Sequence, residues 1–211
     1  KREMAVVRKS CRKNGGFTVV EMAIAGSLLL AILGAAIGMF LAAADSQKQA
    51  EALAHLQDSA RNAISQIDQD IKSAKSVLAS AEVGEASFSS SANTIVLALP
   101  TWNGADFVPN ETDTVIYTYD SNNKSLRVIV SPGPHSARPA ENRILIPSGV
   151  LNCSFTYFTL SGTQKDPGVS PPNWDEVVLV ETAVTLQITK NNHTYTQSLT
   201  GESRLRNWEP P

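Results

Sequence analysis

The sequence has little cysteine and no recognisable catalytic or metal-binding motif. It contains two cysteines, Cys11 and Cys153, which are too few for a disulfide framework. No cluster of His, Cys, Asp or Glu has metal-ligand spacing, because the three histidines are scattered along the chain. Phosphate-binding, dinucleotide-binding and nucleophile-elbow motifs are also missing. These absences favour a protein that is not an enzyme, with no cofactor and no metal.

Positive charge is scarce outside the start of the chain. Residues 1–16 contain six lysines and arginines against the single acidic residue Glu3, a net charge of +5. The remaining residues carry a net charge of −7. Non-specific nucleic-acid binding needs clustered Lys and Arg, so the acidic body gives no strong nucleic-acid signal.

Charge is missing altogether from residues 22–44. This run is long enough to cross a bilayer as a helix, and the basic leader predicts a cytoplasmic N-terminus with the body on the other side. A secretory signal peptide is a second interpretation, because three alanines at residues 42–44 offer a small-residue cleavage site. The run is about twice the usual ~7–15 apolar residues of a signal peptide, however. A carboxylate at the mouth of such a run, here Glu21, is expected to be paired and functional.

Between the basic leader and the apolar run lies the junction Gly16-Phe17-Thr18-Val19-Val20-Glu21. This junction resembles the cleavage and methylation signal of type IV prepilins and type II secretion pseudopilins. The resemblance implies cleavage between Gly16 and Phe17 by a prepilin peptidase, followed by N-methylation of Phe17. It also implies a single-pass inner-membrane protein that joins a pilus or pseudopilus with other pilins, its head periplasmic or extracellular. In such a stack, Glu21 of one subunit can receive the Phe17 amine of the next.

Gly34 and Gly38 form a G-x-x-x-G pair inside the apolar run. Small residues let helices approach closely in lipid, so we expect these two glycines to serve helix packing. Local weakening of the helix, at ~1 kcal/mol per glycine, is a second interpretation.

A one-sided apolar stripe follows the apolar run without a break. Residues 45–80 contain neither glycine nor proline. Apolar side chains recur there three or four residues apart, at Leu53, Leu56, Ala60, Ile64, Ile67, Ile71, Ala74 and Leu78. This spacing predicts one continuous helix from about Phe17 to Ala79, with a membrane-spanning half over residues 17–44 and an amphipathic half over residues 45–80.

A β-rich head is predicted over residues 81–211, where the apolar pattern changes to period 2. We expect strands over residues 94–99, 114–119, 125–130, 143–146, 151–160, 176–189 and 194–199. Loops are expected over residues 81–92, 131–139 and 161–174, a turn at residues 191–192, and turn-rich chain over residues 102–113. The predicted fold class is α+β and type IV pilin-like, with a long N-terminal helix packed on an antiparallel sheet.

Within the family, the stem and head are most similar to J-type minor pseudopilins and W-type minor pilins. The matching stem pattern comprises Arg61, Asp70, Ile71 and Ala74. The resemblance therefore implies a minor structural subunit. Two alternatives stay open: a membrane-anchored periplasmic binding or enzymatic domain, and a subunit of a DNA-uptake (competence) pilus. Three tryptophans in predicted loops or the tail could contact partners or cover the core: Trp102, Trp174 and Trp208.

Overall fold

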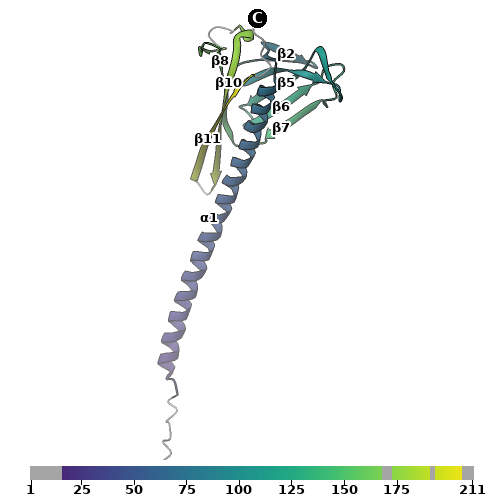
Figure 1. The fold of residues 1–211 in the computed structure, drawn as a ribbon. Coiled ribbons are helices and arrows are strands. Elements are labelled where there is room, and N and C mark those ends of the chain that lie inside the picture. Colours follow the sequence, from purple (N-terminus) through teal and green to yellow (C-terminus); the bar gives the residue numbers. More distant parts are fainter. Residues whose placement is uncertain (1–15, 168–172, 191–192, 206–211) are drawn as a thin grey trace, which may run out of the picture. The chain divides into compact units, whose positions relative to one another are not determined.

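The computed structural model describes residues 16–167, 173–190 and 193–205 (Figure 1). The chain divides into two compact units, residues 1–49 and 50–211, and each is considered by itself. One helix, α1 (Val19–Ser73), begins in the first unit and ends in the second. The basic leader up to residue 15, the predicted turn at residues 191–192 and Trp208 lie outside the described residues.

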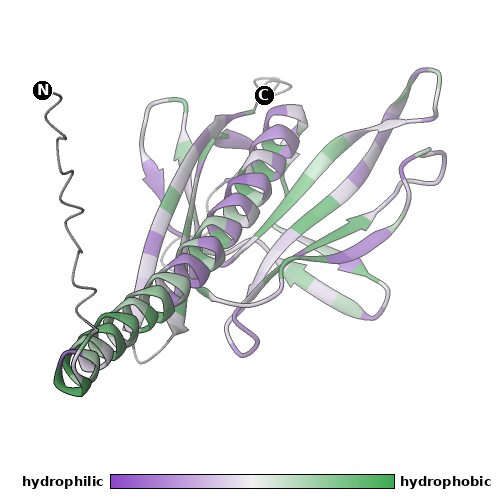
Figure 2. Ribbon diagram, turned by 90° about the horizontal axis from the view of Figure 1, so that it is seen from below, coloured by the Kyte–Doolittle hydropathy of each residue, from purple (hydrophilic) through white to green (hydrophobic). Residues whose placement is uncertain are grey.

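The described part of the first unit consists of the start of α1 and the residues just before it. Every side chain from residue 16 to residue 43 is exposed. Figure 2 shows this stretch of α1 as mostly apolar. By length and composition, α1 is the one helix among the described residues that could cross a membrane.

The second unit contains the amphipathic part of α1, whose apolar stripe packs on the sheets. Ile67 and Ile71 are fully buried, and Ala60 and Ile64 lie beside them in the core. The stripe predicted from the sequence is therefore the face that packs. Ala63, which the three-or-four spacing omits, is buried on the same face.

The helix ends at Ser73 and not near Ala79 as expected. The amide nitrogens of Lys75 and Leu78 donate to carbonyl oxygens of a neighbouring strand, at 2.8 Å each. Because these amides find partners on a strand edge, the chain leaves the helix even though its apolar spacing continues. The predicted stripe therefore extends past the end of the helix.

Three antiparallel sheets follow α1. The five-stranded sheet has the order β1-β4-β5-β6-β7 and contains β1 (Ser76–Val77), β4 (Thr94–Trp102), β5 (Phe107–Asp120), β6 (Ser125–Ser131) and β7 (Glu141–Ile146). The four-stranded sheet has the order β11-β10-β8-β9 and contains β8 (Val150–Thr159), β9 (Gln164–Lys165), β10 (Val177–Lys190) and β11 (His193–Arg204). A separate pair contains β2 (Ser80–Val83) and β3 (Ala86–Ser89), and a short 3₁₀ turn, η1 (Trp174–Glu176), precedes β10. The predicted α+β class, a long N-terminal helix packed on antiparallel sheet, is confirmed.

Some strands depart from the sequence-based expectation. The hairpin of β2 and β3 lies where a loop was predicted, and it turns at Gly84, whose φ of 63° suits glycine. β4 continues through Pro100. The strand β1 pairs only with Leu97 and Ala98 of β4, so Pro100 lies at an open sheet edge, where the amide hydrogen that proline lacks is not needed. β5 begins at Phe107 within the segment predicted to be turn-rich, because Phe107 pairs with Trp102 across the hairpin.

One apolar core joins α1 to the inner faces of the two larger sheets. Its largest fully buried side chains include Tyr117 of β5 and Tyr157 of β8. Trp174 packs edge-on against Tyr157, with ring centroids 5.1 Å apart, and so covers the core. Cys153 is buried and free, and burial raises the pKa of its thiol to about 12, so it behaves as a small apolar residue.

Gly201 of β11 lets this strand approach α1 closely. A Cβ atom added at Gly201 would lie 2.7 Å from Cγ2 of Ile64 and 2.9 Å from Oδ2 of Asp68. Ile64 is a branched side chain of the core cluster, so its Cγ2 cannot move aside without disturbing the core.

We therefore expect Gly201→Ala to lower the free energy of unfolding by ~1–3 kcal/mol, as overpacking does. Urea unfolding of the full chain, followed by circular dichroism, measures this change. Glu202→Ala, at the exposed neighbouring residue, is the control and should leave stability nearly unchanged. Equal stability of the two variants would contradict the close-packing explanation.

Candidate processing and assembly site

The first turn of α1 is closed by a reciprocal pair of side chains. The amide nitrogen of Glu21 donates to Oγ1 of Thr18 at 3.2 Å. In return, Oε2 of Glu21 accepts hydrogen bonds from the amide nitrogen and the hydroxyl of Thr18, at 2.9 and 3.1 Å. This arrangement is a capping box, in which two otherwise unpaired donors at the start of a helix are satisfied.

The capping box gives Glu21 a partner within its own chain, which the sequence-based reasoning missed. The spacing Thr-x-x-Glu directly before an apolar run was the signal that could have revealed it. The box also sets where the helix begins, at Val19, so that Gly16 and Phe17 lie outside it.

Gly16 and Phe17 are freely accessible in the described structure. The Phe17 side chain is 81% exposed, and a Cβ atom built on Gly16 would meet nothing within 4 Å. The peptide bond between them therefore lies in non-helical, exposed backbone. A peptidase needs such backbone, because a bond inside a helix is already engaged in hydrogen bonds.

Gly34 and Gly38 lie on the open surface of α1. A Cβ atom at either position would meet no atom within 4 Å. Nothing within the described chain requires these two residues to be glycine, so any close packing at them involves another chain.

A polar contact ties α1 to the five-stranded sheet. The hydroxyl of Tyr117 donates to Oδ2 of Asp70 at 2.5 Å, and Nη2 of Arg143 donates to Oε1 of Gln66 at 3.2 Å. Burial raises the pKa of the Asp70 carboxyl above its ordinary value, although the Tyr117 hydrogen bond and the Arg138 charge act in the opposite direction. Burial and the Asp70 carboxylate likewise raise the pKa of Tyr117, which stays a donor.

A second polar network holds the loop between β6 and β7. The fully buried Asp113 carboxylate accepts from the amide of Gly133 at 2.8 Å, and from the hydroxyls of Thr101 and Ser136 at 3.1 and 3.0 Å. Arg138 lies 3.3 Å from the same carboxylate. This carboxylate is engaged from several sides, and it anchors the loop rather than offering a free base.

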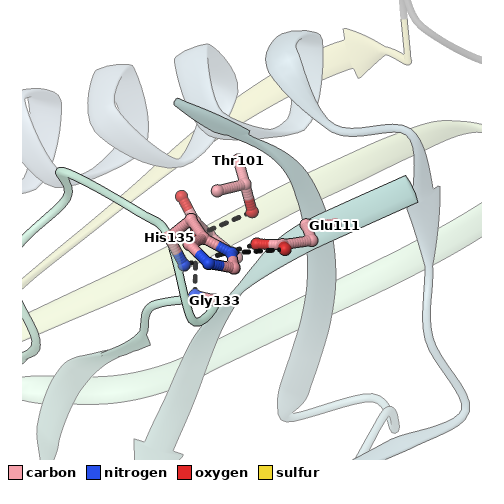
Figure 3. A network of polar contacts seen from close by, with 5 residues as sticks. Thr101, Glu111, Gly133 and His135 are labelled. Carbon is pink, nitrogen blue, oxygen red and sulfur yellow. Dashed lines mark hydrogen bonds and ion pairs between the residues drawn. The ribbon is translucent and has the colours of Figure 1, made fainter. Parts of the chain in front are cut away.

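In the outer part of this loop, the exposed His135 contacts a carboxylate of β5. Nδ1 of His135 lies 2.7 Å from Oε1 of Glu111. Figure 3 shows this contact beside Thr101 and Gly133, on the loop that Asp113 anchors. In the described ranges, no three His, Cys, Asp or Glu side chains are placed to hold a metal ion.

Comparisons with known proteins reveal a similarity in structure. No protein-family model matches the sequence, and a search of curated proteins found no match. Among solved structures, the chain is similar to a type IV-like pilin from Thermus thermophilus. The two sequences are 10% identical, the TM-score is 0.47, and the alignment covers 72% of this chain and 97% of the other.

The contact between Asp70 and Tyr117 leads to a prediction about pH. The carboxyl pKa is raised in the folded chain, so folding favours the protonated form. Wild-type stability from this group is fully present below the unfolded pKa and is lost as pH rises through the folded pKa. Asp70→Asn keeps an acceptor for Tyr117 but cannot ionise.

We expect Asp70→Asn to gain stability relative to wild type as pH rises from about 3.5 to 7, across the range in which a carboxyl of raised pKa ionises. Urea unfolding of the full chain at both pH values measures the difference. Asp58→Asn, at an exposed position on the same helix, is the matched control and should show a smaller change with pH. A relative gain that shrinks with rising pH would contradict the sign.

Proposed function

We propose that this chain is a minor structural subunit of a type IV pilus or a type II secretion pseudopilus. One observation carries the proposal: the Gly16–Phe17 junction lies in exposed backbone immediately before an exposed apolar helix. The first turn of this helix contains Glu21 and is capped by it. Prepilin peptidase, the inner membrane and other pilins would be its partners.

Cleavage after Gly16 would create a cationic amine on Phe17, close to the capping box. The Glu21 carboxylate lies one helical turn away and carries the only formal negative charge among residues 17–44. In a membrane, this charge is costly unless it is hydrogen-bonded or paired. The capping box satisfies the carboxylate in the isolated subunit. Pairing with the amine of a neighbouring subunit would satisfy it in the fibre.

The exposed apolar surface of α1 supports the same proposal. Large side chains on this stretch are exposed, among them Leu30 at 70% and Phe40 at 73%. Lipid would cover this surface before assembly, and helices of other subunits would cover it afterwards. Gly34 and Gly38 would allow close approach of such helices, which matches their open surroundings.

Processing is tested by the N-terminus of the mature protein. After co-expression with a prepilin peptidase, N-terminal sequencing should give a chain that starts at Phe17. Mass measurement should show that one hydrogen of the Phe17 amine has been replaced by a methyl group. Gly16→Leu should leave the leader attached, because the peptidase needs a small residue before the cut, whereas Gly34→Ala should be processed normally. A mature chain starting at Asp45 would overturn the proposal in favour of a secretory signal peptide.

The role of Glu21 is tested by separating its charge from its hydrogen bonds. Glu21→Gln keeps a side chain suited to the capping box but removes the charge. Thr18→Ala removes the Thr18 hydroxyl but keeps the charge, at a capping cost of ~0.5–2 kcal/mol. We expect Glu21→Gln to be processed but to lower fibre assembly strongly, measured by the amount of the subunit in sheared fibres. Thr18→Ala should assemble more efficiently than Glu21→Gln, and the reverse order would assign Glu21 a capping role only.

A further inference from the structure

A groove of about 890 Å³ lies in the second unit, along one side of α1. We call it the flank groove and define it by Arg61, Asp68 and Lys72 of α1, Leu99 and Trp102 of β4, and Leu199 of β11. All of these residues belong to the second unit. None of the residues proposed for processing or assembly lines it.

The flank groove has a cationic side. Arg61 and Lys72 lie on the exposed surface of α1. Neither side chain makes a hydrogen bond or an ion pair with any described residue. The third cation that lines the groove, Arg138, is already engaged with Asp113. Arg61 and Lys72 are therefore available for an anionic partner, although the body of the protein is acidic overall.

Asp68 lines the groove as well, and its carboxylate can accept N–H groups from a guest. The Oδ1 atom of this carboxylate is buried, so a guest would contact the other oxygen, Oδ2. Asp68 also disfavours a guest with negative charge along its whole length, such as a phosphodiester chain.

An aromatic pair forms part of the groove wall. Trp102 and Phe107 contact each other edge-on, with ring centroids 5.3 Å apart, and are 41% and 67% exposed. Exposed aromatic side chains of this kind are common anchors in protein interfaces. Leu199, which is half-buried, extends this apolar surface within the groove, and the buried Leu99 lies beneath it. Trp102 is therefore placed for partner contact, unlike Trp174, which covers the core.

We propose that the flank groove binds an acidic peptide segment of a partner protein. Carboxylates of the segment pair with Arg61 and Lys72, an apolar side chain packs on Trp102, and main-chain N–H groups face Asp68. A peptide combines these three chemistries, whereas a nucleic acid lacks the apolar side chain and is repelled by Asp68. This binding does not depend on whether the chain assembles into a fibre.

The spacing of the two cations specifies the peptide. Arg61 and Lys72 are three helical turns apart, which corresponds to about 16 Å along the axis. An extended peptide rises about 3.3 Å per residue, and only residues an even number apart lie on the same face. Matching carboxylates are therefore about four residues apart, a span of ~13 Å that the long Arg and Lys side chains can bridge. A suitable probe is a fluorescein-labelled peptide with two glutamates at this spacing and with valine and phenylalanine between them.

The test is fluorescence anisotropy with the full chain in detergent micelles. We expect saturable binding of the glutamate peptide that weakens as salt is raised, and no saturable binding when both glutamates are lysines. Arg61→Ala combined with Lys72→Ala should weaken binding about fivefold or more, since two ion pairs are lost. Trp102→Ala should weaken it several-fold through loss of the aromatic anchor.

A charge-matched variant provides the control. Lys48→Ala combined with Arg204→Ala removes two exposed cations outside the groove and should leave the affinity within about twofold, since distant surface charges are screened. Circular dichroism must show that each variant is folded. Equal loss of affinity in both double variants would overturn the proposal, as would the absence of saturable binding. Tighter binding of a fifteen-nucleotide deoxythymidine strand, dependent on Arg61 and Lys72, would instead assign the groove to nucleic acid.

Discussion

Burial of one face of α1 is the interaction on which the second unit depends. Ile67 and Ile71 have no exposed surface, and the core around them includes residues of both larger sheets. Each fully buried isoleucine contributes ~1.5–3 kcal/mol relative to an exposed one, so packing of the helix on both sheets stabilises the unit. Close approach at Gly201 and the hydrogen bond between Tyr117 and Asp70 then set how the helix lies on them. Packing thus supplies most of the free energy of folding, and these directional contacts fix the position of the helix on the sheets.

The first half of the same helix follows a different constraint. Its side chains are exposed to residue 43, so no contact within the described chain stabilises its apolar surface. The capping box at Thr18 and Glu21 pairs two backbone amides of the first turn within the same chain. An apolar helix that is capped within its own chain but uncovered on its surface is suited to lipid or to other helices. The proposed role in assembly follows from this combination.

Much of the fold could be predicted because it follows local rules. The three-or-four spacing of apolar residues identified the packed face of α1, and the alternation in residues 151–160 identified β8. The end of α1 could not be predicted, since the edge of β4 takes the amides of Lys75 and Leu78. The passage of β4 through Pro100 was missed because it depends on how far the edge strand β1 extends. The hairpin of β2 and β3 was missed because its Ser- and Ala-rich sequence resembles a loop, while its apolar side chains pack on a cluster that includes Ile116 and Ile129. The positions of these partners depend on distant parts of the chain.

The sequence by itself determined the apolar helix, its amphipathic continuation and the β-rich head, and it suggested the proposed processing motif, because each is a pattern of neighbouring residues. Only the tertiary structure brought Asp70 to Tyr117, Asp113 to Gly133, and Arg61 to Trp102. The residues of these pairs lie far apart in the chain or on separate elements, and no local spacing encodes which of them meet. The flank groove is of this second kind: Arg61 and Lys72 come from α1 and its aromatic wall from the β4–β5 hairpin, and burial of the helix stripe brings them together.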